Sequence, residues 1–181
     1  MPEPQDVAAR KNAIARSAWF TVPGTLIAAG AAYALTLAPI GLVDAGARLL
    51  YAFRWLFVAF LPYAAVCLHI LYARFAEGSH NPLLGAESER LQVHCRVMQN
   101  TLEQLVWFAL CVLALASYLT PPQMRLVPIV CVLFAVARGV YWWGYLRSNT
   151  LGRAPGVQMT FTLNIPLLVA VLLQSGQSIF G

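Results

Sequence analysis

The sequence predicts an all-α membrane protein with five transmembrane helices and no separate soluble domain. Of its 181 residues, 60% are hydrophobic and only 10% are charged, whereas a soluble domain carries about 25% charged residues. Five apolar stretches each reach the roughly 20 residues that a helix needs to cross a bilayer. The formal charge of +5 does not indicate nucleic-acid binding, because the basic residues form no run or stripe that could follow a phosphate backbone.

The five predicted spans cover residues 17–37, 47–74, 92–119, 125–146 and 157–176. The breaks between them contain the Gly, Pro and polar residues typical of loops, at residues 39–46, 77–90, 120–122 and 147–156. The first span admits a second interpretation as a cleaved signal peptide, because small residues between Ala34 and Ala38 offer a cleavage point. Its apolar run is long for a signal peptide, so we favour a retained helix.

The basic residues predict the orientation of the chain. Five crossings place the two termini on opposite sides of the membrane. With a cytoplasmic N-terminus, the outer loops hold only Arg48 and Arg125, and the inner segments hold Arg10, Lys11, Arg16, Arg74, Arg90, Arg147 and Arg153. This distribution follows the positive-inside rule. We therefore expect an integral protein of a bacterial inner membrane with its C-terminus on the outer side.

Three polar residues of the third span share one helix face. Arg96, Asn100 and Glu103 stand at i, i+4 and i+7, which at 100° per residue places them within a stripe about 60° wide. A charge inside the membrane is costly and marks a functional site by default, although the two charges could simply neutralise each other. Asn100 favours a functional site, because its amide both donates and accepts hydrogen bonds.

The fourth span repeats this pattern with Arg138, Tyr141 and Tyr145 at i, i+3 and i+7. Because the third and fourth spans run in opposite directions, the two polar faces can meet at similar depth. Together they would suit a zwitterionic ligand with carboxylates and an amine. We assign the neighbouring Trp142 and Trp143 to an aromatic belt at the membrane interface.

Cysteine and histidine residues predict neither a disulfide framework nor a metal site. The four cysteines lie in apolar spans without a CxxC spacing. His69, His80 and His94 have no Glu or His partner at the spacing of a metal site. His94 and the adjacent Cys95 point to different helix faces, so they cannot easily chelate one ion.

The two polar motifs make the chain resemble the MAPEG family, the membrane-associated proteins of eicosanoid and glutathione metabolism. The motifs are Arg96-x3-Asn100-x2-Glu103 within RVMQNTLEQL, and Arg138-x2-Tyr141-x3-Tyr145 within ARGVYWWGYL followed by Arg153-Ala154-Pro155-Gly156. The resemblance covers residues from about 47 to 181, which hold four of the five spans. It implies homotrimers that bind glutathione between neighbouring subunits near the cytoplasmic face.

The resemblance also implies roles for single residues. Arg96, Asn100 and Glu103 look like one glutathione-binding group, with Glu103 suited to the amino group of the ligand. Arg138, Tyr141 and Tyr145 look like the matching group on the next helix. Two arginines outside these motifs are also similar to functional arginines of the family: Arg74 to one that contacts a glutathione carboxylate, and Arg153 to one that stabilises the glutathione thiolate in catalytic members.

The additional N-terminal helix is the main departure from the four-helix members, and it resembles the five-helix, mattrin-like branch of the family. The expected organisation is a cytoplasmic tail at 1–16, an extra transmembrane helix at 17–40 and a MAPEG-like four-helix domain at 47–181. The expected function is a glutathione transferase or peroxidase that acts on a lipophilic electrophile. The alternative is a non-catalytic trimeric membrane protein that binds a lipid or has a structural or regulatory role.

Overall fold

Five long helices make up the computed structural model, which describes residues 4–78 and 88–180. Each helix is long and apolar enough to cross a membrane, so the predicted all-α membrane fold is confirmed. In chain order the elements are α1 (Pro4–Leu35), α2 (Ala45–Glu77), α3 (Glu89–Tyr118), the short 3₁₀ helix η2 (Pro121–Arg125), α4 (Leu126–Gly152) and α5 (Ala154–Phe180).

Local sequence signals fix the ends of the central helices. The Asp44 side chain caps the start of α2 by accepting a hydrogen bond from the Ala47 amide at 2.8 Å, and Gly78 ends this helix with a φ of 69°, a conformation that favours glycine. The Ser88 hydroxyl accepts from the Leu91 amide at 3.2 Å and caps α3. These caps lie beyond the predicted apolar spans, because membrane helices continue into the polar interface.

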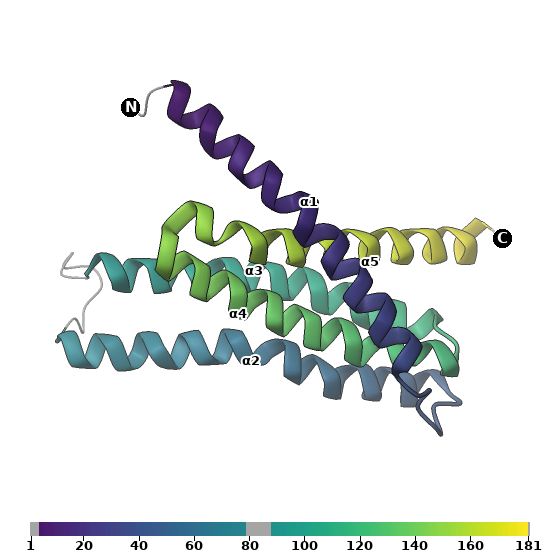
Figure 1. Cartoon of the computed structure of the whole chain (residues 1–181). Coiled ribbons are helices and arrows are strands. Elements are labelled where there is room, and N and C mark those ends of the chain that lie inside the picture. Colours follow the sequence, from purple (N-terminus) through teal and green to yellow (C-terminus); the bar gives the residue numbers. More distant parts are fainter. Residues whose placement is uncertain (1–3, 79–87, 181) are drawn as a thin grey trace.

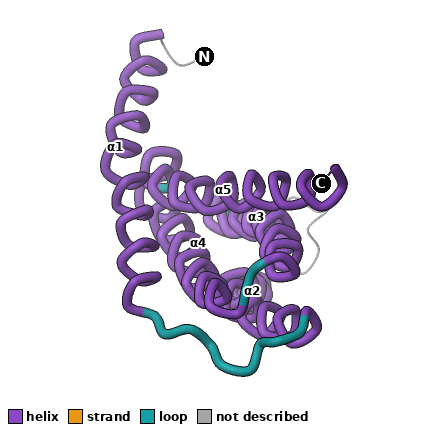
Figure 2. Tube along the Cα trace, turned by 90° about the vertical axis from the view of Figure 1, so that its right-hand side faces the viewer, coloured by secondary structure: helices purple, strands orange, loops and turns teal. Residues whose placement is uncertain are grey.

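Helices α2, α3 and α4 lie side by side along one long axis (Figure 1), and the view turned by 90° shows α5 crossing α3 and α4 at an angle (Figure 2). The largest core cluster draws buried residues from all four helices. Near its middle, the rings of Phe108 on α3 and Phe134 on α4 stack at 4.3 Å. The two termini lie at opposite ends of the bundle (Figure 1), as five crossings require.

The junction between α4 and α5 is much tighter than the predicted break at 147–156. Arg153 alone separates the two helices. Gly144 and Gly152 are in backbone contact, although eight residues of straight helix would place them about 12 Å apart. The end of α4 therefore doubles back, and the missing side chains of these two glycines allow that close approach.

Helix α1 crosses the outside of the bundle diagonally, over α4 and α5 (Figures 1 and 2). It begins at Pro4, so the predicted N-terminal tail is largely the first part of this helix. In the most apolar 18-residue stretch of α1, only 6% of the residues are buried, whereas the corresponding value for α5 is 28%. At one end, the Arg125 guanidinium lies 4.0 Å from the centre of the Tyr33 ring. Near the middle of α1, Ser17 Oγ lies 2.9 Å from Gln158 Oε1.

Candidate functional site

A buried arginine on α4 joins three helices at the centre of the predicted site. The Arg138 side chain is only 1% exposed. Its guanidinium donates to Asn100 Oδ1 at 2.9 Å and to Thr101 Oγ1 at 3.0 Å, both on α3. It also donates to Thr160 Oγ1 on α5 at 3.4 Å. All three acceptors are neutral, so the positive charge is held by hydrogen bonds without a bonded carboxylate.

Two arginines and two tyrosines stack in sequence along α4 towards its junction with α5. The Arg138 guanidinium lies 4.1 Å from the centre of the Tyr141 ring, and the Tyr141 and Tyr145 rings meet edge to face at 5.9 Å. The Arg153 guanidinium lies 5.0 Å from the centre of the Tyr145 ring. Cation–π contacts of this kind favour a fixed position of each guanidinium. The predicted face of α4 is thereby linked directly to Arg153.

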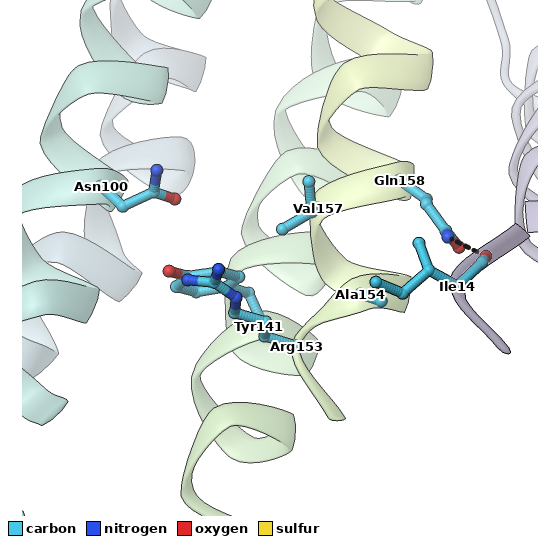
Figure 3. Close-up of a pocket in the computed structure, with 7 residues that line it drawn as sticks. All are labelled: Ile14, Asn100, Tyr141, Arg153, Ala154, Val157 and Gln158. Carbon is cyan, nitrogen blue, oxygen red and sulfur yellow. Dashed lines mark hydrogen bonds between the residues drawn. The ribbon is translucent and has the colours of Figure 1, made fainter. Parts of the chain in front are cut away.

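A cavity of about 280 Å³ opens beside this stack. Figure 3 shows Asn100 of α3 on one side and Ile14 of α1 on the other, with Tyr141 and Arg153 between them. The lining residues are Ile14, Asn100, Tyr141, Arg153, Ala154, Val157 and Gln158. None of these is acidic, and the Arg138 charge lies directly behind Asn100 and Tyr141. The cavity therefore suits a ligand that carries a negative charge and an apolar part.

Gly156 brings the start of α5 against the site. A Cβ atom at this position would lie 2.5 Å from Tyr141 Cα and 2.6 Å from Tyr141 Cβ. One helical turn later, the Thr160 hydroxyl donates to the Gly156 carbonyl at 2.8 Å while accepting from Arg138. Close contact at Gly156 thus sets both the distance of Tyr141 from α5 and the position of Thr160.

Replacing Gly156 by alanine is expected to lower the free energy of unfolding by about 1–3 kcal/mol, the usual cost of overpacking. The added methyl group would meet the Tyr141 backbone, which cannot move as a side-chain end can. Thermal unfolding in detergent measures the effect. Gly176→Ala is the matched control, because the same helix offers it open space. Equal stability of the two variants would show that the contact does not constrain the site.

The MAPEG family model matches residues 53–173, which include the whole polar site and most of the four-helix bundle. The chain belongs to the MAPEG family. No curated protein and no solved structure shows significant similarity to the chain. The MAPEG family includes both glutathione-dependent enzymes and non-catalytic members. Helix α1 lies wholly before the matched residues.

The MAPEG motif on α3 divides between two environments. Asn100 is half-buried against Arg138, whereas Arg96 and Glu103 are exposed on the outside of the subunit. Glu103 accepts a hydrogen bond from the Gln99 amide at 3.3 Å. We call Arg96, Gln99 and Glu103 the polar face of α3. Arg74 lies elsewhere, at the end of α2, where its guanidinium is 3.9 Å from Cys95 Sγ.

Four residues that shape this site were not among the predicted site residues. Thr101 and Thr160 are fully buried acceptors for Arg138, and Ile14 and Gln158 line the cavity. For the threonines a signal was present, because one directly follows Asn100 and the other lies one turn after Gly156. No signal in the sequence pointed to Ile14, since its place depends on how α1 packs.

Two histidines meet on the other side of α3. His69 Nε2 and His94 Nε2 lie 3.1 Å apart, although 25 residues separate them, so no local spacing could reveal the pair. The Trp142 indole donates to His94 Nδ1 at 3.0 Å. Trp142 therefore links α4 to α3, which differs from the aromatic belt that we predicted for it; Trp143 is 62% exposed.

The hydrogen bond from Trp142 determines which nitrogen of the neutral His94 ring carries the proton. Since His94 Nδ1 accepts, the proton of its neutral ring resides on Nε2 and points to His69 Nε2. A metal ion between the two Nε2 atoms would need the lone pair that this proton occupies. No group of three or more potential metal-ligating side chains occurs in residues 4–78 and 88–180. His80 lies outside the described residues.

Proposed function

We propose that this MAPEG protein is a glutathione-dependent membrane enzyme, a transferase or peroxidase that acts on a lipophilic electrophile. One observation carries the proposal: the cavity brings Asn100 and Tyr141, one residue from each motif, together with Arg153, and none of the described residues that line it is acidic. Its volume of about 280 Å³ is close to the lower end of ligand pockets, about 300 Å³. Its remaining lining supplies apolar surface for a second substrate.

Arg153 is the proposed thiolate-stabilising residue. An ordinary cysteine thiol has a pKa near 8.5 and is mostly protonated at neutral pH, and a fixed positive charge favours the thiolate. Arg153 is half-buried in the cavity wall, where its charge is less screened than in water. Its stacking on Tyr145 holds the charge in place before the substrate binds.

The proposed reaction consumes glutathione as a substrate. In conjugate addition, the thiolate sulfur bonds to the electrophilic carbon of an activated alkene, and the adjacent carbon takes a proton from water, so no group leaves. In peroxide reduction, the sulfur bonds to the outer peroxide oxygen and an alcohol leaves. A second glutathione then releases water and forms glutathione disulfide.

Arg138 acts in this proposal as a positioning residue. Its guanidinium is buried and directs its hydrogen bonds to Asn100, Thr101 and Thr160. It therefore orients the Asn100 amide and lies against the Tyr141 ring, and both of these residues line the cavity. The glutathione-binding role predicted for Arg138 is thus exerted through its neighbours.

A homotrimer would complete the site. Charged side chains in contact with lipid are costly, yet Arg96 and Glu103 are exposed on the surface of the single subunit. Burial of the polar face of α3 against another copy of the chain would remove that cost. It would also place Arg96 and Glu103, one helical turn on either side of Asn100, within reach of a peptide ligand. We retain Arg74 as a candidate carboxylate contact in this assembly.

The proposed site opens towards the cytoplasm. The N-terminus lies at the same end of the bundle as the α4–α5 junction and Arg153 (Figure 1), and the sequence assigns seven basic residues to this side. The positive-inside rule makes it the cytoplasmic side, where glutathione is the main thiol buffer.

Binding of glutathione tests the proposal directly. Glutathione at 100 times its Kd should stabilise the purified protein by about 2.7 kcal/mol, seen as a higher unfolding temperature, and should produce the ultraviolet absorbance of a thiolate. A glutathione analogue with a methyl group in place of the thiol is the control. It should stabilise the protein without the new absorbance.

The same measurements separate the enzyme from the non-catalytic alternative. If glutathione and its analogue leave the unfolding temperature unchanged while vesicles of anionic lipid raise it, the cavity is a lipid-binding site. If glutathione stabilises the protein but no thiolate or conjugate with a generic electrophile forms, the protein binds the peptide without catalysis. Either result would overturn the proposed activity.

A further inference from the structure

The N-terminal helix supplies part of the cavity wall. Ile14 is half-buried and faces the cavity from the side opposite Asn100 (Figure 3). Of the described side chains of α1, that of Ile14 lines this cavity. Because α1 lies outside the matched MAPEG residues, this wall is specific to chains that carry the extra helix.

Hydrogen bonding at Gln158 fastens α5 to α1 at this point. The Gln158 amide donates from Nε2 to the Ile14 carbonyl at 2.9 Å. The Ser17 hydroxyl lies 2.9 Å from Gln158 Oε1 and 3.0 Å from the Ile14 carbonyl, and its single proton can go to either acceptor. We call Ile14, Ser17 and Gln158 the α1 latch. In an apolar environment such bonds gain strength, because few alternative partners compete for them.

The latch lies between the cavity and the outer face of α1. The opposite face of α1 carries large exposed apolar side chains, among them Trp19 at 79%, Phe20 at 78% and Ile27 at 70% exposed. Such a surface suits contact with acyl chains. Ile14, Ala154 and Val157 form the apolar part of the cavity, while Arg153 and Asn100 form its polar part.

We propose that α1 closes the lipid-facing side of the cavity and that Ile14 limits the length of the lipophilic substrate. The inference about substrate length rests on the proposed glutathione chemistry, whereas closure by α1 does not. The sulfur would react beside Arg153, and the apolar tail of the electrophile would extend past Val157 towards Ile14. A smaller residue at position 14 would leave room for a longer tail.

Cysteine labelling tests closure without glutathione. Val157→Cys in the full chain is treated with a bulky maleimide in lipid nanodiscs, and the modified residue is quantified by mass spectrometry. Ser17→Ala should accelerate labelling at position 157 about 5-fold, the population shift expected from one hydrogen bond. Ile14→Ala should accelerate it as well. Ile27→Ala, the matched control on the exposed face of α1, should not change the rate.

A homologous series of alk-2-enals tests the length limit. Ile14→Ala should raise kcat/KM for the long-chain relative to the short-chain alkenals by at least about 10-fold, and Ile14→Trp should change this ratio in the opposite direction. Ile27→Ala should leave the ratio unchanged.

The two measurements fail independently. Equal labelling of Val157→Cys with and without Ser17 and Ile14 would overturn closure by α1, even if glutathione turnover is normal. Accelerated labelling without any glutathione binding would support closure while the proposed enzyme activity fails. Accelerated labelling and turnover with an unchanged chain-length ratio in both Ile14 variants would overturn the role of Ile14.

Discussion

Replacing Arg153 by leucine is expected to lower glutathione conjugation about 100- to 1,000-fold in kcat, the usual effect of removing one fixed group that stabilises developing charge. Among the described residues that line the cavity, Arg153 is the one that carries a charge. Without it, the bound thiol stays protonated and the thiolate absorbance is lost. Single-turnover kinetics with a generic electrophile and difference spectroscopy measure the two effects on the same preparation.

Two further arginine variants make this prediction specific. Arg153→Lys keeps a positive charge and should recover part of the turnover. Arg147→Leu is the matched control, because Arg147 is exposed and its guanidinium lies 5.1 Å from the centre of the Trp143 ring, outside the cavity. Full thiolate formation in Arg153→Leu, or an equal loss in Arg147→Leu, would exclude Arg153 as the thiolate-stabilising residue.

Hydrophobicity and capping residues are local properties, and for this reason the sequence predicted all five helices and their order. The arrangement at the α4–α5 junction could not be predicted from local sequence properties in this way. Gly152 and Gly156 were visible only as signs of a loop, and Gly144 fell inside the fourth predicted span, whereas the structure uses all three for contact between backbones. The path of α1 could not be predicted either, because its apolar residues are distributed around the helix and mark no single buried face.

Helical periodicity predicted which residues belong to the site, but it did not predict which of them are buried within the subunit. It placed Arg96, Asn100 and Glu103 on one stripe, and Asn100 lies at the edge of that stripe which turns towards α4. The contact between Asn100 and Arg138 could therefore have been predicted from the helical pattern. The third partner, Thr160, was not, since its contribution depends on how closely Gly156 lets α5 approach Tyr141.

Replacing Arg138 by methionine is expected to weaken glutathione binding about 10- to 100-fold, the loss that corresponds to one hydrogen bond with a charged group. Asn100 would lose the donor that orients its amide, and Tyr141 would lose the cation beneath its ring. Thr101 Oγ1 would be left as a buried acceptor without its partner. Isothermal titration with the thiol-free analogue measures the affinity without interference from turnover.

Arg54→Met is the matched control for this variant, because it removes an arginine from a membrane helix at an exposed position. It should leave glutathione affinity unchanged. Thr160→Val tests the positioning argument further: it removes one acceptor of Arg138 while keeping the charge, so it should reduce affinity by less than Arg138→Met. If Arg138→Met binds the analogue normally, the buried arginine serves only helix packing, and Asn100 and Tyr141 hold their positions without it.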